Sequence, residues 1–279
     1  IQETIQRYGI TGADDLEIYN ARRSELNQAY IDLLYKRLHR RGVLRRDCQR
    51  LVNQDRNVFA ACIVANGDAD GLVTGLTRSF NASFRQVMQV LGPKPDQRVM
   101  AVSMIVTGRR TIFIADTNVH ELPTAEQMAD IAQQTAAKVR AWGHEPRVAL
   151  VSYSNFGNPE RPTNVAVRGA VSILDRRDVD FEYDGEMSVD VALDMELQAD
   201  SYPFCRLTGP ANILVMPGLH SANISYKLLQ RVGGGSLIGP ILLGVRKPVQ
   251  IVQMGTTVSH IIEAAALAAY DAIDSAAAD

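Results

Sequence analysis

The chain has 279 residues, of which 46% are hydrophobic and 22% are charged, and 29 Lys and Arg oppose 31 Asp and Glu. This composition is typical of a globular protein with a large core, and it excludes an intrinsically disordered chain. The net charge of −2 argues against a protein that mainly binds nucleic acid, because phosphate backbones are held by an excess of basic side chains.

Membrane, disulfide-bonded and metal-binding proteins are not indicated either. No apolar stretch is long enough to span a bilayer, and no secretory signal opens the chain. Cys48, Cys62 and Cys205 are far apart and form no C-x-x-C pair, as expected for reduced thiols in a cytoplasm. The five histidines are scattered and match no metal-binding motif. We therefore expect a cytoplasmic protein that contacts no membrane, no nucleic acid and no metal ion.

The first half of the chain alternates between helical and strand-like patterns. Apolar side chains recur at three- and four-residue spacing before Gly42, which predicts an amphipathic helix. Pro123 and a capping box at 124–127 mark the start of another helix, and Gly143 marks its end. The elements predicted here are a helix over 24–41, a β-like run over 57–64, a turn over 66–71, a helix over 79–91, strands over 99–106 and 111–116, and a helix over 124–142.

The second half of the chain continues this alternation. The predicted elements are strands over 147–152, 179–183, 212–216, 237–244 and 249–253, and helices over 165–174, 188–197, 221–232 and 258–273. Strands that alternate with helices of this length indicate βαβ units and a mostly parallel sheet with helices on both faces. The predicted fold class is therefore α/β.

Several familiar ligand-binding motifs are missing. The glycines at 233–235 follow a predicted helix instead of opening one, so they form no dinucleotide fingerprint, and the P-loop and G-x-S-x-G patterns are absent. The acidic turn at 68–71 lacks the remaining ligands of a calcium loop, which favours a hydrogen-bonded turn. The basic run at 36–50 is favoured as a solvated helix face over a ligand patch. Loops at strand ends remain, since ligands of open α/β sheets bind there.

Two polar segments are candidates for such a site. Tyr153 and Ser154 directly follow a predicted strand, so they belong either to a ligand site or to a turn. Lys227 shares a helix with Arg231, and either side chain meets a phosphate or simply faces water. The residues alone leave both alternatives open.

Seven segments of the chain carry motifs that one enzyme family has in the same order. They are Asp68–Gly75, Ile114–Thr117, Val148–Ser154, Asp184–Glu186, Ala211–Pro217, Ser221–Lys227, and Ile238–Gly244 with Lys247–Pro248. By these segments the chain resembles the phosphate acetyltransferase (phosphotransacetylase) family over nearly its whole length. The resemblance implies a three-layer α/β/α architecture with mostly parallel sheets and two subdomains separated by a cleft. We accordingly expect subdomain 1 to comprise 1–143 plus 245–279, and subdomain 2, through which members dimerise, to comprise 144–244.

Three positions depart from active members of this family. Where the resemblance places a catalytic Ser-Arg pair and a general-base Asp, this chain has Gln253, Met254 and His260. A methionine supplies neither a hydrogen-bond donor nor positive charge, and loss of one electrostatic donor commonly slows a reaction about 10²- to 10³-fold. His260 is an alternative base, yet without the arginine the phosphoryl oxygens stay uncompensated. We therefore expect no catalytic residues in this chain.

The resemblance nevertheless implies a retained cleft that binds acetyl-CoA. The acetyl end is expected near Gln253, Met254 and His260. The full set of expected contacts is Arg85, Tyr153, Ser154, Asn212, Asn223, Lys227, Pro240, Lys247, Gln253, Met254 and His260.

These features favour a sensor over an enzyme. The segment at 205–210 and the Met216–Pro217 pair most resemble the C-terminal phosphotransacetylase-like domain of bacterial multidomain NADP-dependent malic enzymes. That resemblance implies an oligomerising domain that binds acetyl-CoA as an allosteric inhibitor. The N-terminal malic enzyme domains, with NADP and a divalent metal, would oxidise malate to pyruvate outside this chain. The start at Ile1 is expected for such a fragment.

Two other functions remain as alternatives. One is an active phosphate acyltransferase that uses His260 as its base. The other is a purely structural dimerisation domain whose cleft is vestigial.

Overall fold

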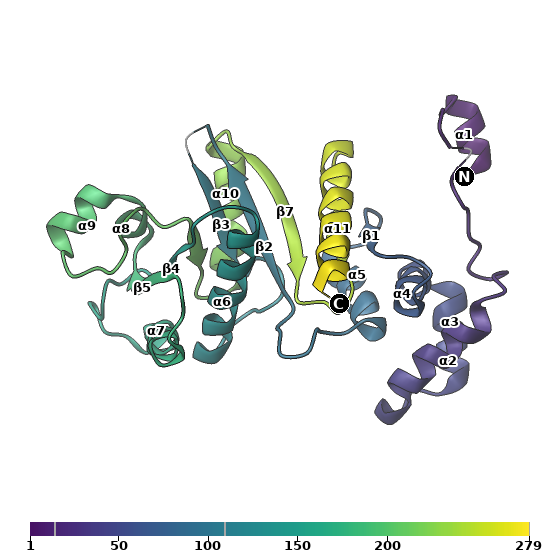
Figure 1. Cartoon of the computed structure of the whole chain (residues 1–279), viewed down its shortest axis with the longest axis horizontal. Helices are drawn as coiled ribbons and strands as arrows, with labels where there is room; N and C mark the ends of the chain where they lie inside the picture. The colour runs from purple at the N-terminus through teal and green to yellow at the C-terminus, as the bar shows by residue number, and fades with distance from the viewer. Residues whose placement is uncertain (14, 109, 279) are drawn as a thin grey trace.

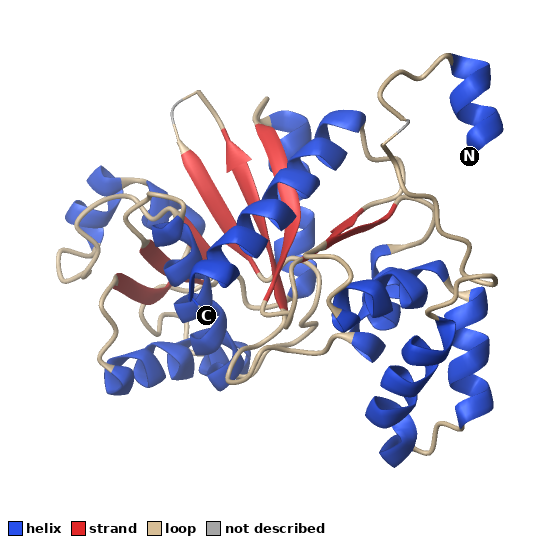
Figure 2. Cartoon of the chain, turned by 45° about the vertical axis from the view of Figure 1, so that its right-hand side comes forward, coloured by secondary structure: helices blue, strands red, loops and turns tan. Residues whose placement is uncertain are grey.

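A six-stranded sheet organises the larger lobe of the chain (Figure 1 and Figure 2). The computed structural model describes residues 1–13, 15–108 and 110–278. The sheet has the order β5-β4-β6-β3-β2-β7. Its strands are β2 (Met100–Val106), β3 (Thr111–Ala115), β4 (Arg147–Val151), β5 (Glu182–Met187), β6 (Ile213–Val215) and β7 (Ser236–Leu243). Strands β3, β6, β4 and β5 pair in parallel, whereas β2 runs antiparallel to β3 and β7, so the predicted mostly parallel sheet is confirmed.

Helices cover both faces of this sheet. They are α6 (Ala125–Ala141), α7 (Val165–Arg177), α8 (Val189–Leu193), α9 (Met195–Ser201), α10 (Leu219–Val232) and the short 3-10 helix η2 (Pro162–Asn164). Helices α6 and α7 share one hydrophobic core with the sheet, and α8 and α10 share another. Successive strand residues point to opposite faces, so Phe113 belongs to the first core and Ile114 to the second. The expected three-layer α/β/α architecture is therefore present.

A smaller, mainly helical lobe surrounds the two-stranded parallel sheet β1-β8 (Figure 2). Its elements are α2 (Asn27–Leu38), η1 (His39–Arg41), α3 (Arg45–Gln54), α4 (Arg56–Asn66), β1 (Leu72–Gly75), α5 (Phe80–Val90) and β8 (Val249–Val252). Tyr30, Leu34 and Phe59 are large members of its core. Helix α11 (Val258–Ala278) contacts β1, β8 and β7 and so joins the two sheets. Helix α1 (Gln2–Tyr8) lies apart from both lobes and buries no residue (Figure 1).

The packing places the division between the lobes before β2. Residues 100–139 share one core with residues 148–215, because α6 covers the same sheet face as α7. In this packing the expected boundary between 143 and 144 follows α6, and the expected boundary between 244 and 245 follows β7. The division into subdomain 1 (1–143 plus 245–279) and subdomain 2 (144–244) stays a prediction.

Local sequence signals account for the elements that were predicted well. Thr124 Oγ1 accepts the Gln127 N–H at 3.2 Å, and Gln127 Oε1 accepts the Thr124 N–H at 2.8 Å, which confirms the predicted capping box. The strands predicted over 99–106 and 111–116 are confirmed as the antiparallel β2–β3 pair. Residue 109, in the turn that we expected between them, lies outside the described residues.

Three predicted elements are corrected. The run over 57–64 is part of α4, because Asp55 caps that helix and a short apolar run does not distinguish a strand from a buried helix. The helix predicted over 188–197 is split, since Asp194 ends α8 and caps α9. The strand predicted over 179–183 is β5, which starts only at Glu182.

Candidate functional site

A pocket of about 300 Å³ lies between the two lobes. Its lining comes from the start of α5, the loop after β3, helix α10 and the loop after β8. The lining residues are Ser79, Phe80, Asn81, Asn118, Leu219, Asn223, Lys227, Gln253 and Met254. The loops involved follow the carboxyl ends of strands, where ligands of open α/β sheets bind, so the location agrees with the expectation from sequence.

Carboxamide side chains dominate the polar part of this pocket, namely Asn81, Asn118, Asn223 and Gln253. Behind them lies Tyr226, which is only 1% exposed. Its hydroxyl oxygen accepts hydrogen bonds from Gln253 Nε2 at 3.1 Å and from Asn223 Nδ2 at 3.5 Å. Burial raises the pKa of Tyr226 above its ordinary value, although these two hydrogen bonds act in the opposite direction. The Tyr226 side chain is therefore a neutral support for two of the carboxamides.

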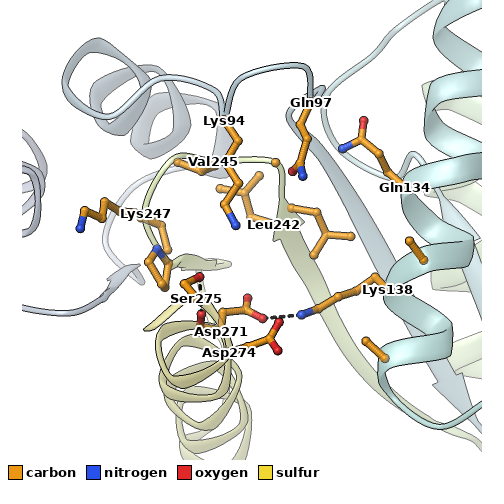
Figure 3. A pocket seen from close by; sticks show the side chains of 16 residues that line it. Lys94, Gln97, Gln134, Lys138, Leu242, Val245, Lys247, Asp271, Asp274 and Ser275 are labelled. Carbon is orange, nitrogen blue, oxygen red and sulfur yellow. Dashed lines mark hydrogen bonds and ion pairs between the residues drawn. The ribbon is translucent and has the colours of Figure 1, made fainter. Parts of the chain in front are cut away.

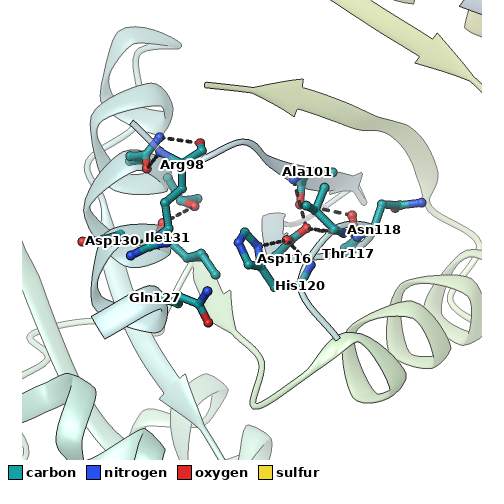
Figure 4. A network of polar contacts seen from close by, with 12 residues as sticks. Arg98, Ala101, Asp116, Thr117, Asn118, His120, Gln127, Asp130 and Ile131 are labelled. Carbon is teal, nitrogen blue, oxygen red and sulfur yellow. Dashed lines mark hydrogen bonds and ion pairs between the residues drawn. The ribbon is translucent and has the colours of Figure 1, made fainter. Parts of the chain in front are cut away.

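A buried carboxylate holds the loop that carries Asn118 (Figure 4). Asp116 is 4% exposed, and its Oδ1 accepts the N–H groups of Ala101 and Asn118, both at 3.0 Å. The same oxygen accepts the Val119 N–H at 3.2 Å. Asp116 Oδ2 accepts the His120 backbone N–H at 2.9 Å and lies 2.7 Å from His120 Nδ1. The loop is thus fixed, and within the described part of the chain the buried Asn118 Oδ1 has no hydrogen-bond partner.

The rim of the pocket carries positive charge. Lys227 is exposed there, with its Nζ 5.8 Å from the centroid of the Tyr226 ring. The N-termini of α5 and α10 also reach the pocket, at Ser79 and Leu219. Because the N–H groups of a helix N-terminus carry partial positive charge, the rim suits anionic groups such as phosphate.

Met254 and His260, both expected at the acetyl end, lie in different places. Met254 lines the pocket, is 62% exposed, and offers no donor to a ligand. His260 lies in the first turn of α11 and lines an adjoining cavity of about 20 Å³, which Pro240 and Gln253 also line. Gln253 is therefore shared by both spaces, whereas His260 does not line the pocket itself.

Three predicted contacts from α5 and β4 do not line the pocket. Arg85 is exposed on α5, one helical turn beyond Asn81. Ser154 is buried after β4 and donates a hydrogen bond to Glu186 Oε1 at 2.8 Å. Tyr153 beside it is 62% exposed. The hydrogen bond of Ser154 is buried within the protein, which agrees with the alternative that Ser154 belongs to a turn and not to a ligand site.

Asn212 also lies away from the pocket, because it precedes β6 and so stands at the amino end of that strand. Its Oδ1 accepts the Arg147 N–H at 2.8 Å, and its Nδ2 donates to the Glu145 carbonyl at 2.7 Å. The Asn212 side chain thus connects the start of β6 to the start of β4.

Lys247 lines a different pocket, of about 280 Å³ (Figure 3). Lys94 lines it from the loop after α5, Lys138 lines it from α6, and Asp271 and Asp274 line it from α11. Lys138 forms an ion pair with Asp271 at 2.5 Å. Basic and acidic groups thus share this pocket, which distinguishes it from the carboxamide-lined pocket.

Three residues at or behind the pocket were not expected from the sequence, namely Asn81, Asn118 and Tyr226. Asn118 directly follows the motif at 114–117, and Tyr226 lies inside the motif at 221–227. Tyr226 is three residues beyond Asn223, so helical spacing places them on one face. This three-residue spacing was the feature of the sequence from which Tyr226 could have been predicted as a neighbour of Asn223.

In the described part of the chain, no group of three or more His, Cys, Asp and Glu side chains is arranged to hold a metal ion. Within the same residues, no helix has both the length and the apolar character required to cross a bilayer.

A comparison with known families identifies the evolutionary relationship. Residues 1–269 match the family described as phosphate acetyl/butaryl transferase. The chain belongs to this family. The resemblance drawn from the seven sequence segments is therefore confirmed.

The relatives similar to this chain include a malic enzyme and a phosphate acetyltransferase. The NADP-dependent malic enzyme of Rhizobium meliloti (strain 1021) is 51% identical over 273 residues, which are 98% of this chain but 36% of that protein. The phosphate acetyltransferase of Treponema pallidum (strain Nichols) is 34% identical, over 96% of this chain and 82% of that protein. The chain thus spans about a third of its malic enzyme relative.

Solved structures of the same family share the fold. A phosphotransacetylase from Streptococcus pyogenes superposes with a TM-score of 0.88 at 30% identity, covering 98% of this chain and 83% of that one. The EutD phosphotransacetylase from Staphylococcus aureus gives a TM-score of 0.84 at 26% identity, covering 97% and 83%. The expected fold is confirmed over nearly the whole chain.

Proposed function

We propose that this chain is the phosphotransacetylase-like regulatory domain of a cytoplasmic NADP-dependent malic enzyme, and that it binds acetyl-CoA in the carboxamide-lined pocket without reacting with it. The observation that carries the proposal is a pocket lined by Gln253 and Met254, the residues that the sequence resemblance sets where the family has its Ser-Arg pair. The 51% identity to a malic enzyme that is much longer than this chain supports the same context.

The chemistry of the pocket supports binding. Lys227 and the N-termini of α5 and α10 supply positive charge for the phosphates of CoA. The carboxamides supply neutral donors and acceptors for an arm that itself contains amides. The pocket therefore suits a ligand that is anionic at one end and neutral at the other.

The same pocket does not support transfer to phosphate. Met254 has no N–H group and Gln253 has no charge, so neither stabilises charge that develops on an acyl phosphate. His260 faces the adjoining cavity with Pro240, so a base at that position has no catalytic partner in the pocket. Binding without turnover follows from this arrangement.

Regulation also requires contact with other parts of the protein. An effector acts at a distance only when it binds two global states with different affinity. We infer that acetyl-CoA inhibits malate oxidation by the preceding malic enzyme domains, which hold NADP and a divalent metal. We also infer self-association through α10, where Ile224, Leu228 and Val232 form an exposed apolar stripe with four-residue spacing in the expected dimerisation part of the chain.

Calorimetric titration of the chain with acetyl-CoA tests the proposal. We expect saturable binding to one site per chain, together with a rise in melting temperature. Absence of heat and of thermal shift at millimolar acetyl-CoA would overturn the proposal in favour of a structural domain. A coupled assay for acetyl-CoA formation from acetyl phosphate and CoA tests the transferase alternative. Turnover by the wild-type chain that is lost in His260→Ala would establish that alternative.

A further inference from the structure

Tyr226 accepts hydrogen bonds from two of the carboxamide side chains that line the pocket, Gln253 and Asn223. Its hydroxyl oxygen has two lone pairs, and it receives two N–H bonds, from Gln253 and from Asn223. Tyr226 itself is buried and does not line the pocket. It therefore acts on a ligand only through these two side chains.

The hydrogen bonds to Tyr226 determine which polar groups remain for a ligand. Asn223 Nδ2 donates to Tyr226 and also to the Thr117 carbonyl at 3.3 Å, which occupies both of its N–H groups and leaves Oδ1 as an acceptor. Gln253 Nε2 donates one N–H to Tyr226, so in the described residues its second N–H is left as a donor. The buried Asn118 Oδ1 is a further acceptor without a partner among those residues.

The groups around Tyr226 are neutral and directional. They are one amide donor on Gln253 and two carbonyl acceptors on Asn223 and Asn118, while Asn81 and the charged Lys227 also line the same pocket. An uncharged carbonyl needs one donor, and amide N–H groups need acceptors, so the set matches a thioester on an amide-bearing arm. A phosphoryl group needs several donors or a cation, so it is matched by Lys227 and not by these carbonyl oxygens.

We propose that Tyr226 is a positioning residue that directs the second N–H of Gln253 to the acyl carbonyl of the thioester, so that the pocket distinguishes acyl-CoA from free CoA. This inference rests on the proposed function, and it adds that the acyl carbonyl is the group of the ligand that the pocket recognises. Asn223 and Asn118 accept hydrogen bonds from the amides of the arm.

The test compares acetyl-CoA with CoA by calorimetric titration of the wild-type chain, Tyr226→Phe and Gln253→Met. We expect the wild type to bind acetyl-CoA more tightly than CoA. Because a neutral hydrogen bond is worth only a modest net stabilisation, each variant should weaken acetyl-CoA binding about three- to ten-fold and weaken CoA binding less.

Tyr270→Phe is the matched control, since the Tyr270 hydroxyl donates to the Ala141 carbonyl and does not line the pocket. It should leave the affinities for both ligands unchanged, and melting curves should show that all variants are folded. Equal wild-type affinities for the two ligands, or equal weakening of both in Tyr226→Phe, would overturn the inference while the proposed function stands. Failure of the wild type to bind either ligand would overturn both.

Discussion

Lys227 Nζ lies 5.8 Å from the centroid of the Tyr226 ring, which places the pocket's positive charge beside the buried tyrosine that supports its carboxamides. A ligand with phosphates at one end and an uncharged acyl group at the other would use both features. This pairing distinguishes the site from the pocket around Lys247, where lysines and carboxylates are mixed.

Removing the Lys227 charge should weaken acetyl-CoA binding without affecting the fold. Exposed charge pairs contribute about 0.2–1 kcal/mol, so we expect the dissociation constant of Lys227→Ala to rise about two- to five-fold at low salt. The difference from wild type should shrink as ionic strength increases, because salt screens exposed charges. Lys94→Ala, in the other pocket, is the control and should bind like wild type. Equal effects of the two variants would argue against an anion site at Lys227.

Asp116→Asn should destabilise the protein. The buried carboxylate accepts four backbone N–H groups, and an amide of the same size presents a donor to some of them. Leaving buried donors unpaired costs about 1–3 kcal/mol, and we expect a loss of this size in the free energy of unfolding from urea titration. Asp200→Asn, on the exposed surface of α9, should change it by less than about 0.5 kcal/mol. A wild-type urea midpoint for Asp116→Asn would contradict the structural role assigned to this network.

Stability should depend on pH through Asp175. The hydrogen bond from the Tyr183 hydroxyl, followed by the Arg206 guanidinium, lowers the pKa of Asp175 below its ordinary 3.8. A carboxyl group whose pKa is lowered by folding stabilises the folded state above its unfolded pKa, and the effect disappears as pH falls through the folded pKa. Melting temperatures of wild type and Asp175→Asn should therefore differ at neutral pH and converge below pH 3.8. Tyr183→Phe should lose only part of the difference, since Arg206 Nη1 remains 2.6 Å from Asp175. A difference that persists unchanged in acid would contradict this assignment.

Charge on the α10 stripe should prevent self-association. Leu228 is 60% exposed at the centre of the stripe, so an aspartate there costs little in the monomer but would be buried in a dimer. We expect sedimentation velocity to show a monomer for Leu228→Asp and a dimer for wild type. Leu44→Asp, at an exposed leucine before α3, is the control and should leave the dimer intact. A wild-type monomer, or a dimer that survives Leu228→Asp, would contradict the proposed interface.

Local signals predicted much of the fold because they act within a few residues. The Thr124–Gln127 capping box starts α6 as expected, and Ser79 caps α5. The run over 57–64 was assigned to the wrong class because its apolar residues have no clear period, and the decisive side chain, Asp55, precedes it. Patterns without periodicity do not separate a short strand from a buried helix.

The candidate site was predicted only in part, because strand direction and tertiary packing decide which polar residues meet. Asn223, Lys227, Gln253 and Met254 do line one pocket. Asn212 was misplaced, since a residue before a strand and a residue after it point to opposite ends of the sheet. Tyr226 was missed because a tyrosine on the inner face of a helix is, in sequence, an ordinary core residue.

The central claim is that the chain holds acetyl-CoA and leaves it intact. Equilibrium dialysis of the wild-type chain against acetyl-CoA in phosphate buffer, followed by mass spectrometry of the ligand on both sides, measures retention and turnover in one sample. We predict that acetyl-CoA is retained by the protein and recovered unchanged, with no acetyl phosphate. Recovery of CoA and acetyl phosphate, or equal acetyl-CoA concentrations on both sides of the membrane, would contradict the claim.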